Sequence, residues 1–76
     1  MTVSEQLLTL VAERFGRDRT KLRVEDDFFD ALEIDSVDAM TLLTAVEEKF
    51  GVEIPDYEVQ DVRTFAALAD VIQRRL

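Results

Sequence analysis

Apolar residues recur at helical spacing in three stretches of the chain, and its only two glycines, Gly16 and Gly51, directly follow two of them. Glycine readily adopts the left-handed conformation in which helices commonly end, so both positions predict helix C-termini. No internal repeat, low-complexity tract or Pro/Gly/Ser-rich linker interrupts the 76 residues. The pattern therefore predicts an all-α fold in a single domain over residues 1–76.

The first two predicted helices have clear boundaries. Thr2 is expected to cap the first helix together with Glu5 in a capping box, and Gly16 ends it. The second helix is expected over residues 36–50, with Gly51 behind it. The residues expected to face the core are Val3, Leu7, Leu10, Val11 and Phe15 in the first helix, and Ala39, Leu42, Leu43, Val46 and Phe50 in the second.

Two further helices complete a small four-helix bundle with one short third member. Pro55 disfavours helix at Ile54, and Asp56 is expected to cap a short helix over residues 57–61. Thr64 is expected to cap the last helix. The apolar row of that helix consists of Phe65, Leu68, Ala69, Ile72 and Leu76.

Residues 17–35 form a connection much longer than the usual 4–6 residues or so between helices. We expect five apolar residues to anchor it to the core: Leu22, Phe28, Phe29, Leu32 and Ile34. The length predicts a crossing segment that delivers residue 36 to one end of the bundle. A plain structural loop is the alternative.

A lone serine, Ser36, stands at the start of the second predicted helix. Asp35 is a good N-cap, and Asp38 is placed to reach back to it in a second capping box worth about 1 kcal/mol. The Ser36 hydroxyl is then held out to solvent, where free backbone N–H groups favour an attached phosphate. Local sequence alone also fits an ordinary helix start.

Acidic residues are concentrated in the middle of the chain. Residues 25–61 contain 13 acids and the single base Lys49, within a chain of net charge −8. Such a surface repels nucleic acid and anionic lipid and attracts basic patches on partner proteins. A solvated surface that keeps a small domain soluble is the plainer interpretation.

The charged surface coincides with a small apolar spot on the second helix. The spacing turns Val37 and Met40 toward solvent, with Asp38, Glu47 and Glu48 around them. An apolar centre with a charged rim is typical of a docking surface. We therefore expect these five residues to contact partner proteins.

Composition excludes most catalytic chemistry. The chain has no Cys and no His, so it offers no thiolate, imidazole base or usual zinc ligand. The acidic run at residues 25–30 fails the EF-hand pattern, since Phe28, Ala31 and Val37 occupy its third, sixth and twelfth positions counted from Asp26. We expect no metal site and no enzyme. The absence of a signal-type or membrane-spanning segment predicts a cytoplasmic protein that does not insert into membranes.

The runs Leu32-Glu33-Ile34-Asp35-Ser36-Val37-Asp38 and Ala45 to Asp56 resemble the acyl carrier proteins, and the similarity extends to both ends of the chain. The resemblance implies that Ser36 carries a 4′-phosphopantetheine arm, transferred from coenzyme A by a phosphopantetheinyl transferase. The terminal thiol of that arm would hold acyl groups as thioesters. The partners implied are acyl-transferring and acyl-modifying enzymes with basic docking patches.

Three positions depart from the family pattern, which often has Gly at Glu33, Leu at Val37 and an acid at Thr41. The last departure alters the expected partner surface and leaves the modification intact. The chain lacks the Gly-Gly-x-Ser run usual in nonribosomal peptide carriers, so a carrier of fatty acid or polyketide intermediates is favoured over an aminoacyl or peptidyl carrier. Its start at Met1 suggests a discrete carrier, which we expect to be a monomer. An unmodified acidic interaction module is the remaining alternative. The acyl cargo, the pathway and the individual partner enzymes are not legible from the sequence.

Small residues suggest where an acyl chain is protected. Helices containing Ala45, Ala66, Ala67 and Ala69 are expected to part slightly beside Leu42, Val46, Leu68 and Ile72 and so admit the chain. Ordinary tight packing at these alanines is an equal alternative.

Overall fold

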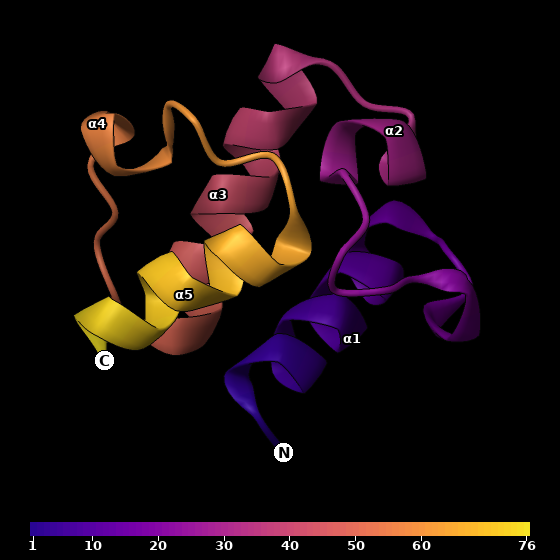
Figure 1. Ribbon diagram of the computed structural model, residues 1–76, viewed down its shortest axis with the longest axis horizontal. Helices are drawn as coiled ribbons and strands as arrows, with labels where there is room; N and C mark the ends of the chain where they lie inside the picture. The colour runs from indigo at the N-terminus through magenta and orange to yellow at the C-terminus, as the bar shows by residue number, and fades with distance from the viewer.

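Five α-helices and one 3-10 helix make up the regular structure of the protein, whose computed structural model describes residues 1–76. In chain order they are α1 (Val3–Phe15), η1 (Arg19–Lys21), α2 (Phe28–Leu32), α3 (Ser36–Phe50), α4 (Asp56–Val59) and α5 (Phe65–Arg75). The three long helices α1, α3 and α5 pack together, with α1 against both α3 and α5 (Figure 1). The only β-type pairing is one isolated bridge. The predicted all-α bundle is confirmed.

Local capping signals set the helix boundaries where the sequence predicts them. The hydroxyl of Thr2 accepts a hydrogen bond from the N–H of Glu5 at 3.1 Å, and the carboxylate of Glu5 accepts one from the N–H of Thr2 at 3.0 Å. Gly16 and Gly51 end α1 and α3 with φ of 64° and 66°. The side chain of Thr64 caps α5. These four predictions are confirmed.

One core lies between the helices and contains most of the predicted residues. In α3, Leu42 and Val46 are buried as expected, whereas Ala39, Leu43 and Phe50 are only partly buried. Four members of the predicted α5 row are buried: Phe65, Leu68, Ala69 and Ile72. The prediction that the fifth member, Leu76, is buried is wrong. This residue follows the last turn of α5 and is 63% exposed, because no other element reaches it.

The connection over residues 17–35 is anchored to the core as predicted. It also contains two short helices, which were not predicted from the sequence. Leu22, Phe28 and Leu32 are buried, and η1 and α2 lie within the segment. Asp27 makes α2 possible, because its carboxylate accepts hydrogen bonds from the N–H groups of Phe29 at 2.8 Å and Asp30 at 3.2 Å. These bonds satisfy N–H groups that a five-residue helix would otherwise leave unpaired.

The short helix α4 begins earlier than predicted. Pro55 occupies the N-cap position with no side-chain cap, and Asp56 is the first helical residue rather than the cap. The helix spans four residues instead of the predicted 57–61. The proline ring already fixes φ at −69°, so no carboxylate is needed to start the turn. Glu58 fastens α4 to α5 through Arg75, at 2.8 Å.

Two segments far apart in sequence are joined through main-chain atoms, and we call this contact the backbone clamp. It consists of three hydrogen bonds. Two of them form the Asp27–Thr64 bridge, from the Phe28 N–H to the Arg63 carbonyl (2.8 Å) and from the Phe65 N–H to the Asp26 carbonyl (3.3 Å), and the third runs from the Ala66 N–H to the Val24 carbonyl (2.7 Å). The clamp places α2 beside the start of α5 and fixes the segment that leads to α3.

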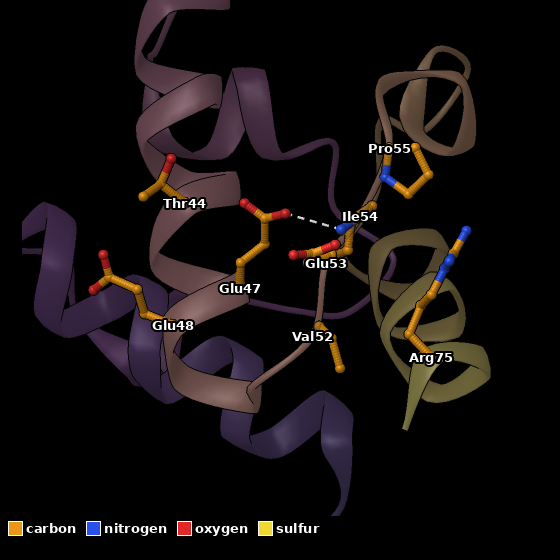
Figure 2. A pocket seen from close by; sticks show the side chains of 8 residues that line it. All are labelled: Thr44, Glu47, Glu48, Val52, Glu53, Ile54, Pro55 and Arg75. Atoms are coloured by element: carbon orange, nitrogen blue, oxygen red, sulfur yellow. Dashed lines mark hydrogen bonds between the residues drawn. The ribbon is translucent and has the colours of Figure 1, made fainter.

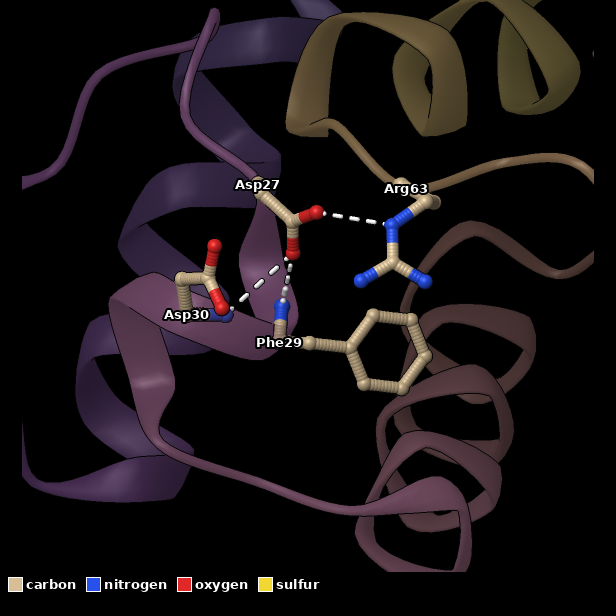
Figure 3. Close-up of polar contacts among 4 residues, drawn as sticks. All are labelled: Asp27, Phe29, Asp30 and Arg63. Carbon is tan, nitrogen blue, oxygen red and sulfur yellow. Dashed lines mark hydrogen bonds and ion pairs between the residues drawn. The ribbon is translucent and has the colours of Figure 1, made fainter.

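Side chains add to the backbone clamp on its outer side. The Nε of Arg63 donates to the carboxylate of Asp27 at 2.8 Å, and the guanidinium lies 4.8 Å from the centre of the Phe29 ring (Figure 3). Burial raises the pKa of Asp27, but the hydrogen bonds from Arg63, Asp30 and Phe29 outweigh it and lower the pKa below its ordinary value. Asp27 is therefore held in its charged form.

Glu33 ends α2 in a conformation that glutamate rarely adopts. Its φ is 55° and its ψ is 48°, which makes it the one non-glycine residue with positive φ. This torsion explains in physical terms why glycine suits the position. The chain turns here between α2 and α3.

We predict that Glu33→Gly stabilises the protein by about 0.5 to 1 kcal/mol. The left-handed conformation costs an L-residue roughly 1–2 kcal/mol, which glycine avoids. Part of this stabilisation is lost because glycine also increases the conformational entropy of the unfolded chain. Urea unfolding measures the change. As a control, Gly51→Ala should destabilise the protein by about 1 kcal/mol through torsion alone, since no atom lies within 4 Å of the added Cβ. A less stable Glu33→Gly variant contradicts this account.

Candidate functional site

Ser36 is the first residue of α3, and this helix begins at the end of the molecule opposite both chain termini (Figure 1). Its side chain is exposed, and its hydroxyl makes no hydrogen bond to the rest of the protein. The only other serine, Ser4, is partly buried in the first turn of α1. Of the two hydroxyls, the one on Ser36 is open to an approaching enzyme.

Asp35 shapes the helix start beside that hydroxyl. One carboxylate oxygen accepts hydrogen bonds from the N–H groups of Val37 and Asp38, each at 3.0 Å, so the predicted N-cap is confirmed. The predicted capping box is wrong, because the Asp38 carboxylate makes no return bond to Asp35. Aspartate is one methylene shorter than the glutamate that completes the box at Thr2.

The helix start fits a phosphate ester in a different way from the one predicted. Two first-turn N–H groups are already satisfied by Asp35, so they are not free for a phosphate. The positive end of the helix dipole still favours an anion attached at Ser36. No neighbouring side chain covers the hydroxyl, and an exposed site suits a long, mobile arm. The residues present fit 4′-phosphopantetheine.

The apolar spot on α3 faces solvent as predicted. Val37 and Met40 are each 70% exposed, Asp38 beside them is exposed too, and Glu48 is exposed further along α3. Both large apolar side chains therefore lie mostly outside the core. Their position next to Ser36 makes them available to whatever approaches that serine.

Glu47 has a structural partner that the sequence did not reveal. Its carboxylate accepts a hydrogen bond from the N–H of Ile54 at 2.8 Å, across the loop after α3, while the Glu48 side chain points away from this loop (Figure 2). Ile54 is buried, so its N–H needs an internal acceptor. Glu47 thus supports the loop before α4, and Glu48 carries the free charge.

A small cavity about 80 Å³ in volume lies between α2, α3, α4 and α5. Its lining is entirely apolar: Phe28, Phe29, Ala39, Leu42, Leu43, Val59, Val62 and Leu68. Of the residues named for the predicted opening, Leu42 and Leu68 line this cavity, whereas the alanines Ala45, Ala66, Ala67 and Ala69 do not. The sequence marked Phe28 and Phe29 as anchors of a loop but did not reveal that α4 faces them.

The acidic residues do not assemble into a metal site. No group of three or more Asp or Glu side chains is arranged to hold a cation. In the acidic run, Asp27 caps α2 and Asp26 accepts a hydrogen bond from the N–H of Arg23 at 3.0 Å.

None of the helices has the length and apolar character needed to cross a membrane.

A small helical bundle with one exposed serine at a helix start has the features required of a carrier domain, which bears a group attached at its surface. Comparison with known proteins identifies the family. A family model described as a phosphopantetheine attachment site matches residues 5–72. The chain belongs to this family of phosphopantetheine-bearing acyl carrier proteins.

Individual relatives agree with the family match. The chain is 37% identical to the acyl carrier protein of Tropheryma whipplei (strain Twist), covering 92% of this chain and 85% of the relative. It is 41% identical to that of Myxococcus xanthus, covering 87% and 84%, and 34% identical to that of Clostridium acetobutylicum, covering 93% and 92%. Members of this family bear a covalent 4′-phosphopantetheine group and act as carriers rather than catalysts.

We predict that Glu47→Ala and Glu48→Ala differ sharply in stability. Loss of the Glu47 acceptor leaves the buried Ile54 N–H unpaired and should cost about 1–3 kcal/mol, whereas Glu48→Ala should stay within about 0.5 kcal/mol of the wild type. Urea unfolding gives both values. Amide exchange at Ile54 should accelerate in Glu47→Ala alone; equal behaviour of the two variants argues against the loop-supporting role.

Proposed function

We propose that this protein carries acyl intermediates as thioesters on a 4′-phosphopantetheine arm attached to Ser36. The observation that carries the proposal is the exposed, unpaired hydroxyl of Ser36 at the Asp35-capped start of α3. Asp35 fixes the helix start and so the position of the hydroxyl. The arm supplies the thiol that a chain without cysteine lacks.

The proposal extends to the whole chain as one monomeric, cytoplasmic carrier domain, in fatty acid or polyketide biosynthesis. Its partners are a phosphopantetheinyl transferase and the enzymes that transfer or modify the acyl group. Val37 and Met40 pack against these partners, and Asp38 and Glu48 draw their basic patches. Glu47 contributes charge to the same face while holding Ile54.

The apolar cavity is the part of the bundle that we assign to the acyl chain. All eight of its lining residues are apolar, and every methylene moved into it from water gains roughly 0.8 kcal/mol. The cavity borders α3, the helix that begins at Ser36. An acyl chain on the arm therefore has an apolar site along α3, the same helix whose first residue bears the arm.

We predict that Ser36 is the only residue modified. Incubation with coenzyme A, magnesium and a broad-specificity phosphopantetheinyl transferase should add one phosphopantetheinyl group to the wild type, and intact mass spectrometry detects it. Ser36→Ala should abolish the mass shift, and Ser4→Ala serves as the matched control that keeps it. Labelling that persists in Ser36→Ala refutes the assignment.

We predict that charge and packing on α3 have separable kinetic effects. Asp38→Lys and Glu48→Lys should slow phosphopantetheinylation and weaken its salt dependence, because rim charges act on the encounter rate. Val37→Ala should raise the apparent KM with little change in salt response. Thr41→Glu should strengthen docking. An unchanged rate for both lysine variants at low salt shows that α3 is not the docking surface.

We predict that acyl chains stabilise the bundle until the cavity is full. The melting temperature of the loaded protein should rise from a short to a longer saturated acyl group and then level off, because about 80 Å³ holds only part of a long chain. Thermal unfolding followed by circular dichroism measures this series. A melting temperature independent of chain length places the chain outside the protein.

A further inference from the structure

The charged side chain of Arg63 lies over Phe29, one of the residues that line the apolar cavity. Phe29 lines the cavity and is only partly buried. The guanidinium of Arg63 lies 4.8 Å from the centre of its ring, and Asp27 anchors that guanidinium at 2.8 Å (Figure 3). Arg63 thus lies over the ring while its own position is fixed by an ion pair.

Phe29 is one of five lining residues that are only partly buried, the others being Ala39, Leu43, Val59 and Val62. Phe28, Leu42 and Leu68 in the same lining are each at most 6% exposed, so other groups pack behind them. Phe29 follows Phe28 in the five-residue helix α2, but it is only partly buried and has Arg63 over its ring. A ring backed by a surface side chain swings outward more easily than one backed by the core.

The cavity is small for a long acyl chain. Its volume of about 80 Å³ is well below the roughly 150 Å³ of an apolar cavity that admits benzene. A chain longer than the cavity has to displace part of the lining. The ease with which the Phe29 ring moves outward then sets how much of the acyl chain enters the cavity.

We propose that Arg63, anchored by Asp27, limits the length of acyl chain that the protein shelters by holding Phe29 against the cavity. The inference rests on the proposed function, because it takes the cavity as the site of the acyl chain. Arg63 is a positioning residue here: it contacts Phe29 and not the lining as a whole. Its planar guanidinium both covers a ring and pairs with a carboxylate, which lysine does less well.

The fold permits a direct test of this role. Residues 24–28 and 63–66 are joined by main-chain hydrogen bonds, which survive loss of the Arg63 side chain. That side chain is 61% exposed and fills no core position. Asp27→Asn separates the functions of Asp27, since asparagine still caps α2 but no longer offers a charge to Arg63. Arg14, exposed in the last turn of α1, provides the matched control.

The first measurement uses the protein without any acyl group. In Arg63→Ala and Asp27→Asn, the methyl resonances of the cavity-lining Ala39 and Leu43 should shift as the Phe29 ring gains freedom, and Arg63→Lys should fall between these variants and the wild type. Arg14→Ala should leave them unchanged. Unchanged resonances in Arg63→Ala overturn the inference, whatever the outcome for the carrier function.

The second measurement loads the arm with saturated acyl groups of increasing length. For a chain beyond the wild-type plateau, Arg63→Ala should slow thioester cleavage by hydroxylamine about two- to fivefold, the range set by an exposed cation–π contact. The melting-temperature plateau should move to longer chains. A plateau identical in wild type, Arg63→Ala and Arg14→Ala overturns the inference and leaves the carrier function standing. A wild type without any dependence on chain length overturns the cavity assignment and the inference together.

Discussion

The backbone clamp between residues 24–28 and 63–66 is the contact on which the arrangement of the site depends. It closes a long loop of chain, and the entropy lost in doing so is offset by main-chain hydrogen bonds that also satisfy otherwise unpaired groups. Because of it, α2 lies beside α4 and α5 and forms a wall of the cavity. The segment after α2 then has only a few residues in which to reach Ser36, so the clamp helps to fix where α3 begins.

The carboxylates of this acidic protein divide into two groups that net charge does not distinguish. Seven of them hold the structure together by accepting internal hydrogen bonds: Glu5, Asp18, Asp26, Asp27, Asp35, Glu47 and Glu58. Others, such as Asp38 and Glu48, are exposed and make no such bond. The first group shapes α1, α2, α3 and the loop before α4. The second is free to meet a partner without any cost to the fold.

The predictions that succeeded rest on signals confined to a few neighbouring residues. A threonine three residues before a glutamate, or a glycine after an apolar row, acts through adjacent backbone atoms, so Thr2 and Gly51 could be assigned from sequence. The Glu47–Ile54 bond and the cavity arise from groups that only folding brings together. The prediction that Leu76 is buried failed because the apolar periodicity continues in the sequence beyond the point where other helices cover α5. The resemblance to acyl carriers supplied the chemistry of Ser36, which no local pattern specifies.

The left-handed torsion at Glu33 also bears on how sequences of this kind diverge. Selection at that position acts on the main chain, since the side chain is exposed and the requirement is a positive φ. Glycine, asparagine and aspartate meet it easily, whereas valine, isoleucine and threonine do not. A preference for such residues three positions before Ser36 is readily mistaken for a sign of direct chemical participation. The torsion gives it a conformational origin instead, and the fold of this chain tolerates the strain of a glutamate there.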